Sequence, residues 1–124
     1  MPRFVAVALV VGIGLAVSDC VEQPQQPSDC AQPTVTRNAT LTADGLQPRT
    51  IDVCRGQQVT LSVKVGANGV LHIHGYDEQA KEVRVGQTAT FGFPAVRSGQ
   101  FVIELHTTEA PGGLNMGVFT VHEP

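Results

Sequence analysis

The segment "QVTLSVKV", residues 58–65, decides the fold class. Its apolar residues alternate with polar ones, so that one face of the segment carries Val59, Leu61, Val63 and Val65. Successive side chains of a β-strand point to opposite faces of the sheet. The alternation therefore predicts a strand with one face in a hydrophobic core and the other face in solvent.

Similar short runs continue along the chain on both sides of this segment. They are "TVTRNATLT", "TIDV", "VLHIHGY", "KEVRV", "TATFGF", "QFVIELH" and "MGVFTVH", with glycines between most of them. Seven or eight short strands with a turn about every ten residues are typical of a β-sandwich. We therefore expect one all-β domain over residues 34–124.

The composition limits the classes of function. The chain has 124 residues, 42% of them hydrophobic, which suits one small globular domain. A formal net charge of −3 leaves no basic surface to attract nucleic acid or an anionic membrane. The sequence shows no activated nucleophile, carboxylate pair or cofactor motif, so we expect that the protein is not an enzyme.

The first 33 residues are typical of an exported protein. Residues 4–17, "FVAVALVVGIGLAV", form an apolar run shorter than the roughly 20 residues of a transmembrane helix. The following "LAVSDC" resembles the lipobox of bacterial lipoproteins, which implies a lipid on Cys20. We expect a signal peptide at 1–19 and a polar, proline-rich tether at 20–33.

This interpretation predicts a protein of the cell envelope, either in the periplasm or on the outer cell surface. We expect it to contact the membrane only through its lipid anchor. Asp19 departs from the small residue that a lipobox places before its cysteine. The alternatives are cleavage by the ordinary export route and a signal anchor that stays in place.

The remaining cysteines are Cys30 and Cys54. If Cys20 carries lipid, they are left as a pair in an oxidising compartment, where a disulfide is the expected state. Such a bridge leaves no free thiolate for metal binding or catalysis. The alternative is a reactive Cys54.

Histidines provide the candidate metal ligands. His72 and His74 project to the same face of a strand, and imidazole nitrogens suit copper or zinc. His106 ends the run "GQFVIELH", and Met116 is a fourth, soft group. Phe101, Ile103 and Leu105 alternate as core-facing residues, so His106 points away from the core in a regular strand. We therefore expect a turn or bulge to redirect it toward the site.

Two neighbours of the histidine pair are candidates for supporting roles. We expect Tyr76 to be a half-buried plug whose hydroxyl binds a turn carbonyl. We expect Asp77 to fix the turn or to accept a hydrogen bond from an imidazole behind the metal ligands. Glu104 is expected to be solvated, and His122 to lie on the surface.

The order "IHGYD", "SGQFVIELH", a glycine-rich loop and "MGVFTV" resembles the cupredoxin-like domains of exported bacterial proteins. The resemblance covers about Thr50 to Glu123 and implies a Greek-key β-sandwich with a metal site at one end. It matches His74 to the first copper histidine and places Met116 within one residue of the axial methionine. Leu105 stands where a blue-copper protein has its cysteine, which argues against blue-copper electron transfer.

These observations predict an exported lipoprotein that binds copper, with zinc as the alternative, at a thiolate-free site for delivery or sensing. A second hypothesis is a metal-free interaction module that presents the loop "TTEAPGGLNM" to a cell-envelope partner. The histidine pair also resembles the HxH strand of copper–zinc superoxide dismutase. That enzyme needs further histidines, and the chain has none between Tyr76 and His106.

Overall fold

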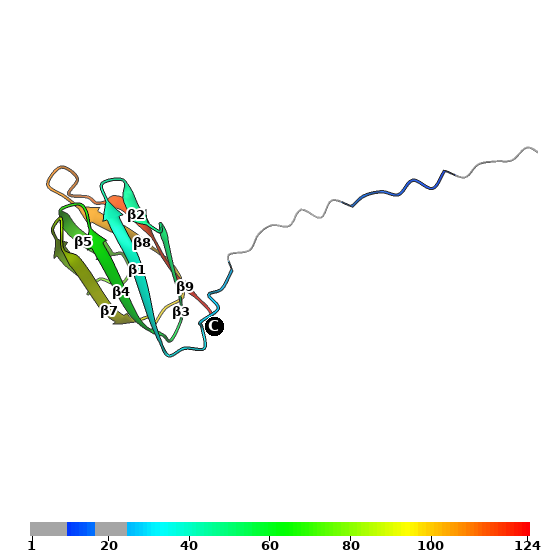
Figure 1. Ribbon diagram of the computed structural model, residues 1–124, viewed down its shortest axis with the longest axis horizontal. Helices are drawn as coiled ribbons and strands as arrows, with labels where there is room; N and C mark the ends of the chain where they lie inside the picture. The colour runs from blue at the N-terminus through cyan, green and yellow to red at the C-terminus, as the bar shows by residue number, and fades with distance from the viewer. Residues whose placement is uncertain (1–9, 17–24) are drawn as a thin grey trace, which may run out of the picture.

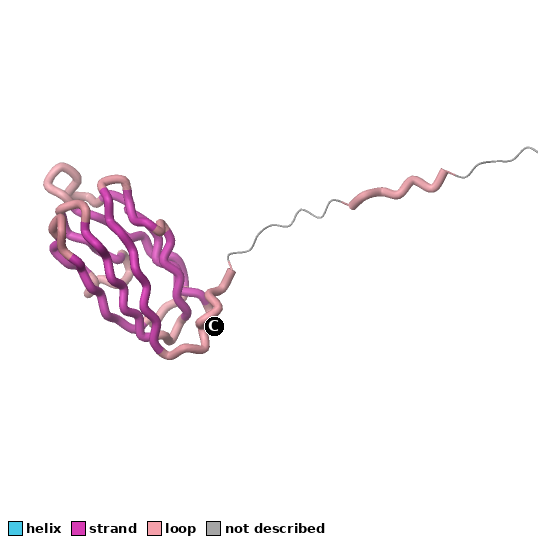
Figure 2. The backbone as a smooth tube through the Cα atoms, in the orientation of Figure 1, coloured by secondary structure: helices cyan, strands magenta, loops and turns pink. Residues whose placement is uncertain are grey.

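The computed structural model describes residues 10–16 and 25–124 (Figures 1 and 2). Its strands lie between residues 34 and 122, and none of the described residues is helical. The strands are β1 (Thr34–Thr42), β2 (Gly45–Gln47), β3 (Thr50–Cys54), β4 (Gln58–Val65), β5 (Gly69–Ile73), β6 (Ala80–Val83), β7 (Thr88–Pro94), β8 (Gly99–His106) and β9 (Leu114–His122). The all-β prediction is confirmed. The additional strand is β2, whose three residues are too short to show an alternating pattern.

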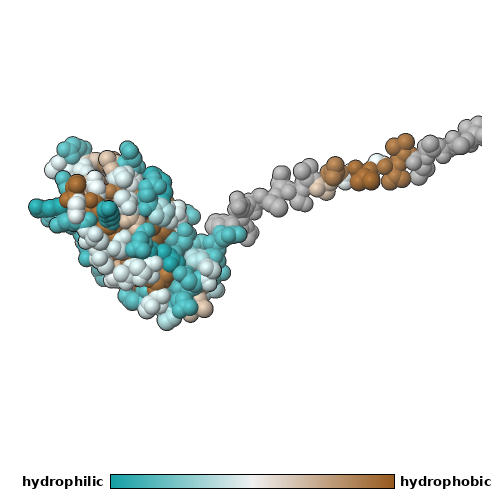
Figure 3. Space-filling view, in the orientation of Figure 1, coloured by the Kyte–Doolittle hydropathy of each residue, from teal (hydrophilic) through white to brown (hydrophobic). Residues whose placement is uncertain are grey.

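The strands form two sheets that pack face to face as a sandwich (Figure 1). One sheet has the order β2-β1-β4-β7 and the other the order β3-β9-β8-β5-β6. The pairs β1–β4 and β3–β9 are parallel, whereas the other pairs are antiparallel. The four alternating apolar residues of β4 are buried, as their spacing predicted. The outer face seen in Figure 3 is mostly hydrophilic or neutral.

The antiparallel pair β5–β8 positions the candidate site. Leu71 lies opposite Leu105, and Ile73 lies opposite Ile103. All four side chains are at most 2% exposed and belong to the core. The intervening residues of both strands therefore point outward, away from the other sheet.

The neighbouring pair β8–β9 contains a β-bulge. Ile103 pairs with Gly117 and Glu104 pairs with Asn115, so Met116 is an extra residue on β9. A bulge leaves such a residue without a cross-strand partner and bends the strand. The Met116 side chain is 3% exposed and packs in the hydrophobic core.

The segment before β1 is attached to the sandwich at one end. The predicted disulfide between Cys30 and Cys54 is confirmed, with a Cα–Cα distance of 5.4 Å. Arg37 donates to both carboxylate oxygens of Asp29 at 2.9 Å. These hydrogen bonds hold the pKa of Asp29 below its usual value. The buried side chain of Gln57 also donates to the carbonyls of Asp29 and Gln32.

Residues 10–16 are also described by the structure. They form an exposed apolar run without regular secondary structure (Figure 3). Most of the predicted signal peptide, and Cys20 with its predicted lipid, lie outside the described residues. Within residues 10–16 and 25–124, the structure contains no helix of the length and hydrophobicity that a membrane span requires.

Replacing Cys30 and Cys54 together by serine should lower the free energy of unfolding by about 3 kcal/mol. The chain-entropy model assigns roughly this value to a loop closed across 24 residues. Urea denaturation followed by circular dichroism measures the difference. A reductant should lower the stability of the wild type to that of the double variant and leave the variant unchanged. A wild-type midpoint that ignores the reductant would contradict the prediction.

Candidate metal centre

The outward-facing residues of β5 and β8 form a four-cornered patch. His72 lies opposite Glu104, and Val70 lies opposite His106. Side chains directly opposite each other on an antiparallel pair have Cβ atoms about 4.5–5.5 Å apart. Three corners of this patch therefore carry metal-binding side chains, and the fourth corner carries valine.

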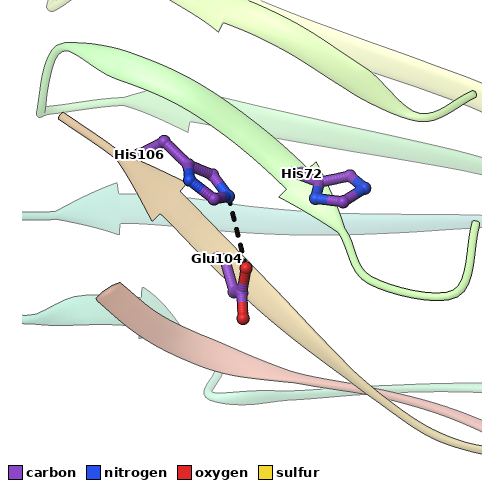
Figure 4. Close-up of side chains that lie close together, drawn as sticks. All are labelled: His72, Glu104 and His106. Carbon is purple, nitrogen blue, oxygen red and sulfur yellow. Dashed lines mark ion pairs between the residues drawn. The ribbon is translucent and has the colours of Figure 1, made fainter. Parts of the chain in front are cut away.

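His72, Glu104 and His106 each offer a ligand atom, and these atoms all lie within 4.8 Å of one another (Figure 4). The Nε2 atom of His106 is 3.2 Å from Oε2 of Glu104, and the two imidazole centroids are 5.9 Å apart. Two donors bound at about 2.0–2.1 Å from one ion lie roughly 3–4 Å apart. Small rotations of these side chains can therefore bring all three donors onto one ion.

The hydrogen bonds of His106 determine which of its nitrogens faces this cluster. Its Nδ1 atom lies 2.9 Å from the carbonyl oxygen of Pro111. A carbonyl only accepts hydrogen bonds, so Nδ1 carries the hydrogen. The Nε2 atom of a neutral ring then presents its lone pair to the Glu104 carboxylate. In that state two lone pairs face each other and repel, and a positive charge at this point, either a proton on Nε2 or a metal ion, removes the repulsion.

The β8–β9 loop, residues 107–113, holds the Pro111 carbonyl in place. The amide of Ala110 donates to the hydroxyl of Thr107 at 3.0 Å, and the amides of Thr107 and Gly113 both donate to the Ala110 carbonyl. The loop is thus a compact turn with its own backbone hydrogen bonds. An outer hydrogen bond of this kind fixes the tautomer and orientation of a ligand histidine.

Gly113 allows the loop to pass close to the cluster. It has a φ of +94°, and a Cβ atom at this position would lie 3.0 Å from Oε2 of Glu104 and 3.0 Å from Cε1 of His106. Any larger residue would therefore push both side chains. The loop contributes to the centre by position as well as by hydrogen bonding.

The structure brings together two of the three predicted histidines. His72 and His106 share the outer face of the sheet, so His106 needs no turn or bulge to reach its partner. His74 lies just beyond the end of β5 and is exposed, outside the group of three. Its ring is 5.9 Å from that of His72.

Two positions where cupredoxins carry sulfur ligands lie in the core here. The Met116 side chain is buried there, away from the outward-facing cluster. Leu105, at the position of the blue-copper cysteine, is 2% exposed and also faces the core. Neither side chain contributes to the group of three ligand residues.

Tyr76 and Asp77 have different relations to the cluster. The Tyr76 hydroxyl donates to the carbonyl of Arg97 at 3.0 Å, and its ring packs against three phenylalanines. Asp77 is exposed, with Oδ1 3.5 Å from Nε2 of His72. Asp77 is therefore placed to orient a ligand histidine, whereas Tyr76 closes the core.

Glu104 is the cluster residue that the sequence reasoning missed as a ligand. The signal was present, because Glu104 and His106 have the same i, i+2 spacing as His72 and His74. His122 lies at the other end of β9, where its Nε2 atom is 2.8 Å from Oδ1 of Asp52.

An open groove with a volume of about 1020 Å³ adjoins the cluster. Its lining includes Val70, Glu82, Arg84 and His106, together with Thr107, Thr108, Glu109 and Pro111 of the loop. The side chains of His72, Glu104 and His106 remain 20–30% exposed. An ion at the cluster would therefore be accessible from solvent.

No protein-family model matches the chain, and no curated protein matches it. Solved structures do match. One is the apo form of a copper binding protein, with a TM-score of 0.59 and 11% identity over 79% of this chain and 93% of that one. Another is the metal binding domain of a Cu(I)-exporting P-type ATPase from Streptococcus pneumoniae, with a TM-score of 0.58 and 11% identity over 73% and 87%.

A multicopper oxidase also matches, with a TM-score of 0.58 and 18% identity over 73% of this chain. The chain covers only 39% of the oxidase. At sequence identities of 11–18%, the similarity to these structures shows the fold alone. The chain has a cupredoxin-like fold, as the order of its motifs predicted.

Replacing Gly113 by alanine should weaken Cu(II) binding by about 10- to 100-fold, the usual cost of disturbing groups that orient metal ligands. The matched control is Gly86→Ala. Gly86 has a φ of +90° and open space around its Cβ position, so it shares the backbone strain but not the contact. Isothermal titration measures both affinities. Equal losses in the two variants would refute a role for close approach at Gly113.

Proposed function

We propose that this protein binds one Cu(II) ion through His72, Glu104 and His106. The observation that carries the proposal is the position of His106 Nε2, which is 3.2 Å from a carboxylate oxygen while Nδ1 is occupied by the Pro111 carbonyl. A metal ion bound by Nε2 and the carboxylate would stabilise this arrangement, as a proton on Nε2 also would. Two imidazoles and one carboxylate surround that point.

The donor set favours the divalent form of copper. Imidazole nitrogens suit Cu(II) and zinc, whereas thiolates and thioethers select Cu(I). Among the described residues, both cysteines form the disulfide and Met116 is buried in the core. Copper(II) binds such N/O sites more tightly than the other divalent ions of the first transition series, zinc included. Zinc is therefore the weaker competitor for the same site.

We infer a role in copper delivery or sensing rather than electron transfer or catalysis. The partly exposed cluster supports this role, because an ion there can exchange with solvent or with a partner. Two of the similar solved structures are named as a copper binding protein and as the metal binding domain of a copper exporter. Blue-copper electron transfer needs a thiolate, and Leu105 occupies that position.

The proposal includes attachment to the cell envelope through Cys20. It is supported by the apolar run at residues 4–17 and by the lipobox-like "LAVSDC". The Cys30–Cys54 disulfide agrees with an oxidising compartment. Mass spectrometry of the protein purified from membranes tests the lipid on Cys20.

Titration with Cu(II), followed by electron paramagnetic resonance, should show one saturable site with couplings to two nitrogens. His72→Ala, His106→Ala and Glu104→Gln should each weaken binding by about 100-fold or more, since loss of merely orienting groups already costs 10- to 100-fold. His74→Ala is the matched control and should retain the site. A signal that survives His72→Ala with His106→Ala, or that is lost with His74→Ala, would overturn this ligand set.

The oxidation state of copper gives a separate test. Binding of Cu(I), measured by competition with a chromophoric Cu(I) chelator, should be weaker than that of Cu(II) by at least about tenfold, because the site lacks sulfur. Tighter binding of Cu(I) would contradict the proposed donor set. The absence of both ions from the protein would favour the metal-free interaction module.

A further inference from the structure

Three donors do not complete the coordination that Cu(II) prefers. With nitrogen and oxygen ligands this ion favours a square-planar or tetragonal arrangement, which has four donors in one plane. His72, Glu104 and His106 supply three of them. Val70 occupies the fourth corner of the patch and has no donor atom in its side chain. Any fourth donor from this chain therefore lies outside the patch.

Strand β6 carries a carboxylate next to the patch. Glu82 lies opposite Val70 on the antiparallel pair β5–β6, as His106 lies opposite Val70 on the pair β5–β8. Residues directly opposite each other share one face of a sheet, so Glu82 points outward with Val70 and His72. Glu82 and His106 therefore flank Val70 in one row across three strands, and both line the same groove.

His72 has the same relation to Glu82 as to His106. On β6 its direct partner is Ala80, and Glu82 is two residues further along that strand. On β8 its direct partner is Glu104, and His106 is two residues further along. Such diagonal neighbours are about 7–8 Å apart, within reach of long side chains. Since His106 joins the cluster from its diagonal position, the glutamate side chain can join it from the other diagonal.

In the structure the Glu82 carboxylate pairs with a neighbouring cation. Its Oε1 atom is 2.9 Å from Nη2 of Arg84, and the side chains are 69% and 70% exposed. An exposed ion pair of this kind contributes at most about fivefold to an equilibrium constant. A divalent ion held by two imidazoles and a carboxylate is a stronger partner. Its binding can therefore turn Glu82 away from Arg84.

The charges around the cluster favour a ligand from the chain over a free anion. Glu82 and Glu109 line the groove, and Asp77 lies within 3.5 Å of a ligand imidazole. Arg84 is the basic residue that lines the groove. The surroundings are therefore negative, so they attract a cation and repel a free anion. Glu109 lies on the β8–β9 loop, where its carboxylate accepts a hydrogen bond from the Thr108 hydroxyl at 3.1 Å.

We propose that Glu82 is the fourth ligand of the copper ion and exchanges Arg84 for the ion when copper binds. This inference rests on the proposed copper site and extends it from β5 and β8 to the edge strand β6. Two carboxylates then balance the charge of Cu(II), because imidazoles that bind a metal are neutral. The register of β5 and β6 sets the position of this donor, and Arg84 holds it away from the empty site.

The first test compares the Cu(II) affinities of Glu82→Gln and Glu109→Gln by isothermal titration at constant pH and ionic strength. Each variant removes one negative charge from the groove lining. Glu82→Gln should lose at least about tenfold more affinity than Glu109→Gln, since loss of merely orienting groups already costs 10- to 100-fold. Equal losses would show that Glu82 acts only through its charge, and would refute its role as a ligand.

A histidine at the same position gives a readout that charge alone does not move. Glu82→His should add a third nitrogen coupling to the electron paramagnetic resonance signal of bound Cu(II). Glu109→His is the matched control and should keep two couplings. Two couplings in both variants would contradict the assignment, because a side chain at position 82 would then not reach the ion.

Arg84→Gln tests the exchange of partners. This substitution frees the Glu82 carboxylate, so the affinity for Cu(II) should rise by up to about fivefold. In the Glu82→Gln background the same substitution should leave the affinity nearly unchanged, since the two effects are coupled through one ion pair. An equal rise in both backgrounds would assign the effect to the charge of Arg84 and refute the exchange.

Failure of the copper site itself is a separate outcome. If the wild type binds no Cu(II), the proposed copper site fails and the fourth ligand fails with it. If the wild type binds Cu(II) with two nitrogen couplings while Glu82→Gln matches Glu109→Gln, the site of three donors stands and Glu82 is refuted as its ligand.

Discussion

The register of β5 against β8 determines the candidate site. Leu71 and Ile73 face Leu105 and Ile103 inside the core, and this pairing leaves His72 opposite Glu104 on the outer face. A slip of one residue in β5 would place His72 in the core and expose Leu71 and Ile73. Burial of these apolar side chains therefore holds the three residues of the candidate site together, although none of the apolar residues belongs to that site.

The sequence indicated which side chains of each strand face the core, but not which strands pair with each other. Alternation along β4 predicted its buried face, and the same logic placed His72 and His106 outward. It did not reveal that β5 and β8 are neighbours, which brings His72 and His106 together on one outer face. The two strands lie about 30 residues apart in the chain, and alternation along one strand does not specify its neighbour. The emphasis on His74 followed from the family resemblance, whereas the structure groups His72 with Glu104 and His106.

The separation of the cluster from the core has chemical consequences. The position of the blue-copper cysteine, Leu105, faces inward, and so does Met116 because of the bulge in β9. The sulfur of Met116 and the histidine cluster thus belong to opposite faces of the same sheet. A cluster built only from outward-facing residues can be changed with little effect on core packing, and its side chains remain partly exposed to solvent. Both properties support the proposed binding and exchange of an ion.

The two ends of β9 lie next to different parts of the molecule. His122 pairs with Cys54 at the end where the disulfide, Arg37 and Gln57 hold the preceding segment. Leu114 pairs with Leu105 at the other end, next to the candidate cluster. Figure 1 shows the β8–β9 loop at this end of the sandwich, away from the C-terminus. The eight residue steps between them span roughly 26 Å at the usual rise of a strand. The end of β9 next to the candidate cluster is therefore the end away from Cys30 and the segment that precedes β1.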